Sequence, residues 1–262
     1  MPKFNDIDLA NWRDATDINT DSLWIIDKRD NSGAHSGHYH GNFVPQVVNQ
    51  LIKRYTKAGD WVLDPFMGSG TTLIEAQRLN RNAIGIELNK EVAEEARIRI
   101  QQESKKAVEA KIYVGDSAVA NMSKVMDNHG ISEVQFVVFH PPYWDIIHFS
   151  QLKDDISNTD TLESFLSSFG KIIDNTTSRL AKDRYCAVVI GDKYMNGQVV
   201  PLGFHCMNLF LERGFQQKAI IVKNFGETKG KQNQQGIWRY RALASDYSIF
   251  KHEYIFVFKK VF

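Results

Sequence analysis

Short apolar runs alternate along the chain with stretches in which apolar positions recur at helical spacing. The apolar runs are bounded by glycine, proline or charged residues, and β-branched and aromatic side chains in them are typical of buried strands. Strands are expected over residues 59–66, 83–88, 110–116, 134–139 and 184–192. Helices are expected over residues 45–57, 71–79, 90–106, 117–129, 161–181 and 201–214. This alternation predicts a doubly wound, Rossmann-like α/β fold with a mostly parallel sheet and right-handed crossovers.

Two further apolar runs, residues 215–223 and 253–260, have no helical pattern between them. They are expected to pair as antiparallel strands at the edge of the sheet. The polar stretch 226–236 between them is typical of a loop. No composition shift or linker divides the chain, so a single domain over 1–262 is expected.

Composition limits the class of protein. With 262 residues, 43% of them hydrophobic and 24% charged, the chain is typical of a globular protein with a substantial core. A net charge of +1 implies that any nucleic-acid surface is a local patch. Cys186 and Cys206 stand far apart without a second pair, which argues against a zinc ribbon or a disulfide framework and favours core thiols in a reducing, cytoplasmic setting. No membrane span or signal peptide is expected.

Acidic residues stand at the ends of the first three predicted strands: Asp64, Glu87 and Asp116. Gly68 and Gly70 follow the first of them and let the backbone approach a ligand closely. The loop lacks GK[ST], which argues against a triphosphate. A carboxylate at the end of a second strand typically accepts ribose hydroxyls, and Asp116 is placed to accept from an adenine amino group. Together these residues predict a nucleoside site without phosphates, and S-adenosylmethionine is such a ligand.

The fourth predicted strand, VQFVVF, ends in His140, Pro141, Pro142 and Tyr143. The two prolines end the hydrogen-bond ladder and hold the histidine and the tyrosine on a stiff corner at the carboxyl edge of the sheet. Ligands of open α/β sheets bind at that edge. A catalytic corner is therefore one interpretation, and a tight turn capped by an aromatic ring is the other.

These motifs resemble those of the amino-group DNA methyltransferases, which modify adenine N6 or cytosine N4. The resemblance rests on DPFMGSGTT, the acid at 87, GD at 115–116 and PPY at 141–143, and it extends over about residues 33–260. It implies a class I methyltransferase fold and S-adenosylmethionine as cofactor. For cofactor contacts it implies Asp64, Phe66, Gly68, Gly70, Thr71, Thr72, Glu87, Asp116, Phe43 and Pro45. For catalysis it implies His140, Pro141, Pro142 and Tyr143.

The implied division of the chain is an N-terminal arm and cofactor-covering segment (1–44), a cofactor-binding half (45–145) and a target-base half (146–262). Members of the family usually carry a separate target-recognition domain, and none is expected within residues 1–262. DNA contacts are expected instead from 146–161 or from a loop over 224–251, where basic and aromatic residues mix. The DNA-binding candidates are Trp144, Lys229, Lys231, Trp238, Arg239 and Arg241. A solvated loop without ligand is the alternative.

A second departure is His140, which stands where the family has Asp, Asn or Ser, so the target base stays open, with adenine N6 favoured over cytosine N4. A neutral imidazole can accept a hydrogen bond from the target amine. With an unperturbed pKa of about 6.5 for His140, the methylation rate would fall as acid protonates the ring. His35, His38 and His40 form H-x-x-H-x-H without a matching cysteine or acid, so no metal is expected.

The expected activity is methylation of a flipped-out base in double-stranded DNA. A homodimer or a separate specificity partner is the expected assembly. Methylation of RNA or of a protein glutamine on the same core is one alternative. A catalytically inactive subunit that binds DNA or cofactor is another.

Overall fold

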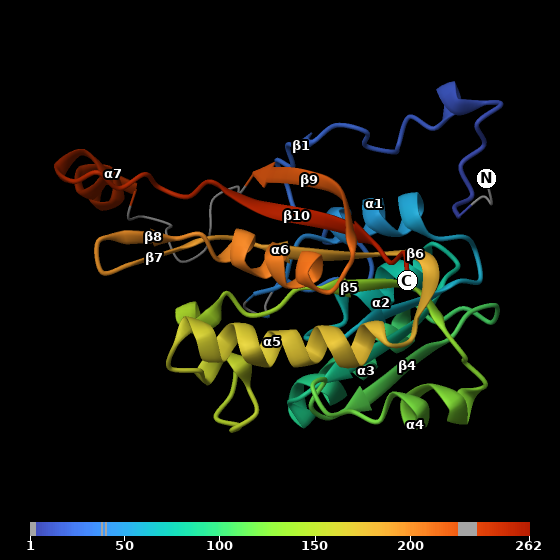
Figure 1. Ribbon diagram of the computed structural model, residues 1–262. Helices are drawn as coiled ribbons and strands as arrows, with labels where there is room; N and C mark the ends of the chain where they lie inside the picture. Colours follow the sequence, from blue (N-terminus) through green and yellow to red (C-terminus); the bar gives the residue numbers. More distant parts are fainter. Residues whose placement is uncertain (1–3, 38, 40, 225–234) are drawn as a thin grey trace.

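The computed structural model describes residues 4–37, 39, 41–224 and 235–262 (Figure 1). Eight of its strands form one sheet in the order β1-β9-β10-β6-β5-β2-β3-β4. These strands are β1 (Leu23–Trp24), β2 (Trp61–Asp64), β3 (Asn82–Glu87), β4 (Ala110–Val114), β5 (Val134–Phe139), β6 (Leu180–Ile190), β9 (Gln216–Asn224) and β10 (His252–Lys259). A separate hairpin pairs β7 (Lys193–Met195) with β8 (Gln198–Val200).

Helices cover both faces of the sheet, as the alternating pattern predicted. They are α1 (Pro45–Tyr55), α2 (Thr71–Arg78), α3 (Lys90–Gln102), α4 (Met122–Met126), α5 (Leu162–Thr177), α6 (Leu202–Glu212) and α7 (Gln235–Ala244). Short 3-10 turns lie at Trp12–Asp14, Asp127–His129, Trp144–Ile146 and Ile156–Asn158. The doubly wound α/β class is confirmed.

The hydrophobic core consists of two layers, one on each face of the sheet. Successive residues of a strand point to opposite faces, so Phe136 and Val138 of β5 pack with α1, α2 and α3, whereas Val137 and Phe139 pack with α4, α5 and α6. In Figure 1, α5 and α6 lie in front of the sheet and α1 and α2 behind it. Cys186 and Cys206 are both fully buried, as expected.

The antiparallel strand is not at the edge, and this part of the prediction is wrong. β10 runs antiparallel to β6 on one side and to β9 on the other. Beyond β9 the sheet gains β1, which pairs parallel to it through Leu23 and Trp24. A two-residue strand has too little periodicity to be recognised in a sequence, although burial of Trp24 anchors it here.

The predicted loop over 224–251 contains a helix, α7, which corrects the sequence interpretation. Residues 225–234 lie outside the described residues, but Gln235–Ala244 is helical. This helix projects from the body of the molecule next to the β7–β8 hairpin (Figure 1). Residues 236–244 are exposed or half-buried, so this part of the helix lacks the buried stripe that marks most helices in a sequence. Arg, Ala and Leu, which have high helix propensity, supply its local preference.

Candidate active site

The carboxyl ends of the parallel strands meet at one edge of the sheet, and polar residues gather there. Glu87 ends β3, Asp116 follows β4 and His140 follows β5. Because β10 runs the other way, its first residues reach the same edge, where Glu253 lies opposite Lys223 of β9. The topology thus brings carboxylates, an imidazole and an ammonium group to the edge where ligands of such sheets bind.

A cavity of about 1280 Å³ opens along this edge. Its walls come from the glycine loop after β2, the ends of β3 and β4, the 140–143 turn, parts of the segment 26–44, and α7. Among the predicted site residues, those that line it are Phe43, Phe66, Gly68, Glu87, Asp116, His140, Pro141, Pro142, Tyr143 and Trp238. Ligand sites usually enclose roughly 300–1,000 Å³, so this volume leaves room for two ligands side by side.

Glu87 holds the glycine loop in place and also faces the cavity. Its carboxylate oxygens accept the backbone N–H groups of Gly68 and Asn89, each at 2.8 Å. Burial raises the pKa of Glu87, while the hydrogen bonds from these amides oppose the shift. Gly68 has φ of +51°, and a Cβ there would lie 3.1 Å from the ring of Tyr39. Glycine at 68 therefore permits both the backbone turn and the close approach.

Asp64 supports the loop from beneath and does not line the cavity, contrary to the predicted cofactor contact. The side chain is 1% exposed. Its oxygens accept the N–H of Phe66 at 2.9 Å and the hydroxyl of Thr72 at 2.5 Å. Burial raises the pKa of this carboxyl to about 6, and the two hydrogen bonds oppose that shift. The aspartate thus ties the end of β2 to the first turn of α2.

Four other predicted cofactor residues also shape the site without lining the cavity: Pro45, Gly70, Thr71 and Thr72. Pro45 is the first residue of α1, as expected. The residue that caps α2 is Gly70, with φ of +86°. These four residues therefore affect a ligand indirectly, through the conformation of the glycine loop.

His140 lines the cavity and is packed between two aromatic rings. The ring centroid of Phe43 lies 4.7 Å away and that of Tyr143 5.9 Å away, both edge-on. Burial lowers the pKa of His140 to about 4; the charge of Glu253 opposes the shift and that of Lys223 adds to it. The assumption of an ordinary pKa near 6.5 is therefore wrong, and the imidazole is neutral at physiological pH.

Tyr143 is fixed by a buried ion pair that sequence reasoning missed. Its hydroxyl donates to Glu253 Oε2 at 2.5 Å, and Lys223 Nζ lies 3.0 Å from Glu253 Oε1. Both charged side chains are almost fully buried and line the cavity beside the tyrosine. Burial, reinforced by the neighbouring carboxylate, raises the pKa of Tyr143. An acid and a lysine inside otherwise apolar strands were the available signal for this site.

Trp144 is part of the core, and its predicted contact with DNA stays a prediction. The side chain is 4% exposed, and its indole N–H donates to the carbonyl of Thr159 at 2.8 Å. The ammonium group of Lys193, which also pairs with Asp145, lies 4.0 Å from the ring centroid. The aromatic ring therefore anchors the chain after the 140–143 turn.

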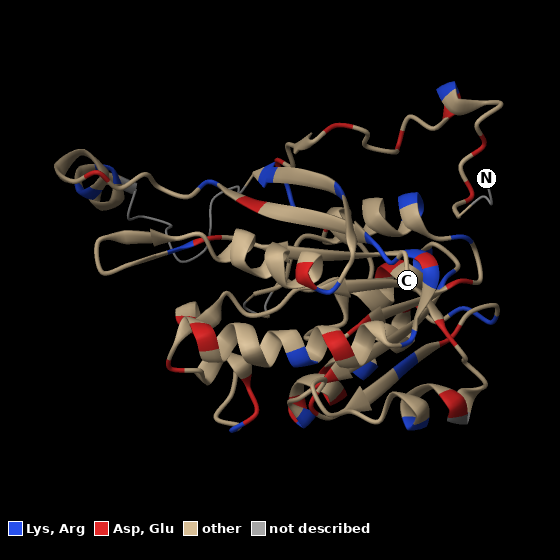
Figure 2. Ribbon diagram, in the orientation of Figure 1, with Lys and Arg blue, Asp and Glu red and all other residues tan. Residues whose placement is uncertain are grey.

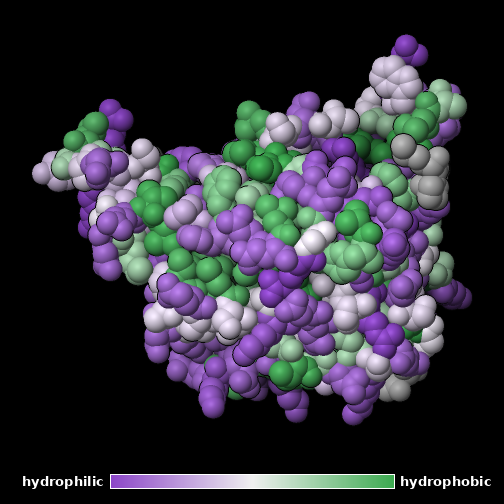
Figure 3. All heavy atoms as spheres, in the orientation of Figure 1, coloured by the Kyte–Doolittle hydropathy of each residue, from purple (hydrophilic) through white to green (hydrophobic). Residues whose placement is uncertain are grey.

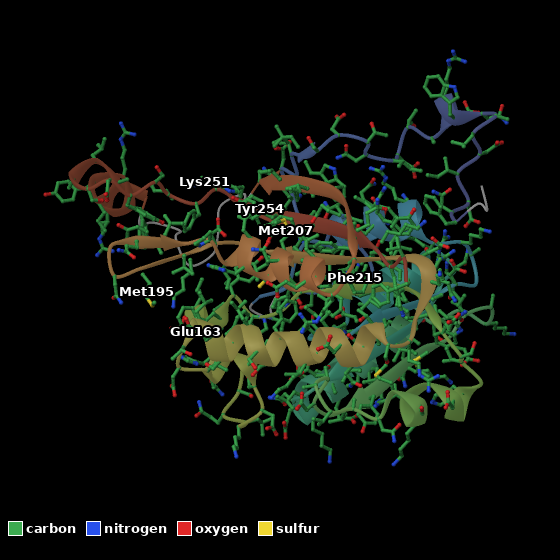
Figure 4. The ribbon with its side chains drawn as sticks, in the orientation of Figure 1. Glu163, Met195, Met207, Phe215, Lys251 and Tyr254 are labelled. Atoms are coloured by element: carbon green, nitrogen blue, oxygen red, sulfur yellow. The ribbon has the colours of Figure 1, made fainter. Side chains whose placement is uncertain are left out.

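The projecting arm, defined as the β7–β8 hairpin together with residues 235–251, carries three of the DNA-binding candidates, Trp238, Arg239 and Arg241. Arg239 and Arg241 are exposed, and the guanidinium of Arg241 lies 5.1 Å from the ring of Trp238. Tyr247 joins the two parts of the arm, because its ring centroid lies 4.4 Å from that of Tyr194 in β7. Figure 2 shows basic residues on α7, and Figure 4 labels Lys251 and Met195 on the two parts of the arm.

Several candidates fall outside this description. Lys229, Lys231, His38 and His40 lie outside the described residues. His35 is the remaining histidine of the H-x-x-H-x-H pattern. It lines the cavity, and its Nε2 lies 2.6 Å from Glu75 Oε1.

Parts of the chain are similar in sequence to known proteins. Residues 5–97 match a family model described as DNA methylase, and residues 54–152 match one described as RMKL-like, methyltransferase domain. The type II methyltransferase M.XycI of Xanthomonas campestris pv. cyanopsidis is 37% identical over 90 residues, which are 34% of this chain and 29% of that protein. The type II methyltransferase M2.DpnII of Streptococcus pneumoniae is 47% identical over 58 residues, 22% of each chain.

These matches, each over part of the chain, support a place for it among the amino-group DNA methyltransferases. The matched segments span between 12% and 29% of the lengths of its curated relatives. A SAM-dependent methyltransferase of Methanosarcina mazei has the same fold, with a TM-score of 0.52 and 14% identity over 80% of this chain and 97% of that one. Within the described residues, no helix is long and apolar enough to cross a membrane.

S-adenosylmethionine is the cofactor that the sequence motifs imply, and residues that line the cavity suit it. Glu87 presents carboxylate oxygens with lone pairs beyond those used by the loop amides, which is what ribose hydroxyls require. Asp116 also faces the cavity, and its Oδ1 accepts the N–H of Ala118 at 2.8 Å. Phe66 adds an aromatic ring to the lining of the same cavity.

The geometry of Asp64 gives a prediction that distinguishes a residue that supports the glycine loop from one that contacts the ligand. Asp64→Asn keeps an acceptor for the amide of Phe66 and a donor for Thr72, so S-adenosylhomocysteine should bind it as tightly as the wild type, as measured by calorimetry. Asp64→Ala removes both hydrogen bonds and should lower the free energy of unfolding by about 1–3 kcal/mol.

The wild type and Asp64→Asn should also differ in how their stability depends on pH. The folded pKa of about 6 lies above the unfolded value near 3.8, so the contribution of this carboxyl to stability falls as pH rises from 4 to 6. Asp64→Asn should therefore gain stability relative to the wild type over that window. A large loss of cofactor affinity in Asp64→Asn would contradict the supporting role.

Proposed function

We propose that this chain transfers a methyl group from S-adenosylmethionine to the exocyclic amine of a base flipped out of double-stranded DNA. The observation that carries the proposal is the single cavity that Glu87 and Asp116 share with His140 and Tyr143. A cofactor at one end and a base at the other would meet inside it. Adenine N6 is the first candidate for the target amine and cytosine N4 the second.

The cofactor end is assigned to the strands before the 140–143 turn. Glu87 accepts the ribose hydroxyls, and Asp116 accepts from the adenine amino group. Phe43 and Phe66 supply apolar walls, while the backbone at Gly68 allows close approach. When bound, S-adenosylmethionine supplies an electrophilic methyl group on a sulfonium.

The target end must make a weak nucleophile reactive, because the lone pair of an exocyclic amine is spread into the base ring. Acceptors aimed at the two amino protons draw this lone pair back to nitrogen. The neutral ring of His140 and the carbonyl of Pro141 are the two acceptors in the proposal. The stiff 140–143 turn holds them, and Tyr143 stacks on the face of the flipped base.

The projecting arm is the proposed DNA contact. Trp238 lines the cavity. Arg239, Arg241 and Lys251 are exposed, and Asp246 is the acidic residue of the segment 235–251. Apolar and polar side chains mix on this end of the molecule (Figure 3), where Tyr240 is 71% exposed. Cations suit phosphates and aromatic rings suit unstacked bases, so the arm can hold the duplex while one base enters the cavity.

The proposal is tested by incubating the protein with radiolabelled S-adenosylmethionine and DNA, RNA or total protein. Label is expected in DNA, with His140→Ala as the inactive control. Digestion to nucleosides and mass spectrometry then distinguish N6-methyladenine from N4-methylcytosine. Label confined to RNA or protein, or no transfer to any substrate, would contradict the proposal.

His140 gives a prediction for the pH dependence of the rate. Its neutral form persists until the pH falls towards about 4, so the acceptor is present throughout pH 5–8. The ratio of single-turnover rates of the wild type and His140→Asn, whose amide oxygen does not titrate, should be constant over that range. A ratio that falls with a midpoint near 6.5 would show that burial does not depress the pKa.

The arm gives a prediction for DNA affinity. Replacing Arg239 and Arg241 with glutamine removes two cations, so the slope of log affinity against log salt should become shallower by about two. Binding of S-adenosylhomocysteine should not change. Arg97→Gln, an exposed arginine of α3 away from the arm, is the matched control. An unchanged slope in the double variant would exclude these arginines from the DNA interface.

A further inference from the structure

Two consecutive isoleucines stand exposed at the rim of the cavity. Ile146 is 51% exposed and Ile147 is 39% exposed, and both line the same cavity as Tyr143. A side chain that lines a cavity and also reaches solvent lies at its opening. Single exposed apolar residues are ordinary on a protein surface, whereas adjacent ones beside a ligand cavity mark a site of interaction.

The chain is anchored immediately before this pair. The indole of Trp144 is buried, donates to the carbonyl of Thr159 at 2.8 Å and lies 4.0 Å from the ammonium group of Lys193. The backbone of Trp144 has φ of +55°, in the left-handed region that a bulky side chain rarely adopts. Such a conformation persists only where the surrounding contacts impose it, so the direction of the chain entering Ile146 is fixed.

The chain is anchored again directly after the pair. His148 Nδ1 lies 3.0 Å from Asn158 Oδ1, and the backbone N–H of Phe149 donates to Ser157 Oγ at 3.1 Å. The ring of Phe149 stacks on that of Tyr39, with their centroids 6.1 Å apart. The two isoleucines therefore sit on a short stretch held at both ends, and little entropy is lost when they enter a binding site.

The chemistry of the pair suits the interior of a base stack. When a base leaves a duplex, its two neighbours lose their stacking contacts, and this loss is part of the cost of flipping. Proteins that open or kink DNA insert apolar side chains, isoleucine among them, between base steps. The acid directly before the pair, Asp145, forms an ion pair with Lys193, which reduces its repulsion of the DNA phosphates.

We propose that Ile146 and Ile147 form a wedge that fills the gap left by the flipped base and so keeps the duplex open. This inference rests on the proposed function, since it takes the cavity to receive a base through Tyr143. The wedge and the projecting arm have different tasks. The arm binds the phosphates around the site, whereas the wedge replaces the stacking of the base that has entered the cavity.

The wedge is tested with two oligonucleotide duplexes that contain a site found by sequencing the DNA labelled in the transfer assay. In one duplex the target base has its normal partner. In the other a pyrene nucleotide stands opposite the target, and its ring fills the gap in place of the protein. The Ile146→Ala/Ile147→Ala variant should lower kcat/KM on the paired duplex by at least about tenfold. The pyrene duplex should bring the variant back to within about threefold of the wild type.

Two control variants separate a wedge from a general effect of apolar surface. Ile146→Leu/Ile147→Leu keeps the bulk of the pair and should retain most of the rate on the paired duplex. Leu152→Ala removes an exposed leucine of the same segment that is not part of the cavity lining. This variant should match the wild type on both duplexes.

The two proposals fail in different ways. A double-alanine variant that matches the wild type on the paired duplex would overturn the wedge. So would a loss that pyrene does not restore, because a residue of the cavity wall is needed whatever stands opposite the target. In both cases methylation by the wild type would leave the proposed function standing. Failure of the wild type to methylate any DNA would overturn the proposed function and the wedge together.

Discussion

The buried carboxylate of Glu253 is the group on which the geometry of the target end depends. Its charge is offset by Lys223, directly opposite on the neighbouring strand, and its second oxygen accepts from Tyr143 at 2.5 Å. Removing one member of such a pair leaves an uncompensated buried charge, which typically costs about 3–5 kcal/mol. Gly191 lies behind the tyrosine ring, where a Cβ would approach it to 3.0 Å. The ring of Tyr143 is therefore fixed by the hydrogen bond of its hydroxyl to Glu253 and by the contact of its edge with Gly191.

The direction of β10 makes this arrangement possible. An antiparallel strand inserted between β6 and β9 brings its first residues, including Glu253, to the edge where the parallel strands end. Glu87 and Asp116 reach the same edge from β3 and β4. One topological feature thus connects the nucleoside end of the cavity with the target-base end, and the 140–143 turn stands between them.

Much of this was predictable from the sequence, because alternating buried strands and helices have strong periodicity. The strand 134–139 and the start of α1 at Pro45 were placed correctly. The projecting helix α7 and the two-residue β1 were missed, since neither has a buried stripe long enough to detect. Asp64 and Trp144 were assigned to ligands from their motif positions, yet their burial and satisfied hydrogen bonds are properties of the fold that no motif records.

The most direct test of the account is a double-mutant cycle on Tyr143 and Glu253, measured as single-turnover methyl transfer to duplex DNA at saturating cofactor. If Glu253 acts by holding the hydroxyl of Tyr143, then Tyr143→Phe and Glu253→Ala should each slow transfer. The double variant should then be no slower than the slower single variant, because the coupled groups act as one. Additive losses, or single variants at the wild-type rate, would contradict a target site organised by this buried carboxylate.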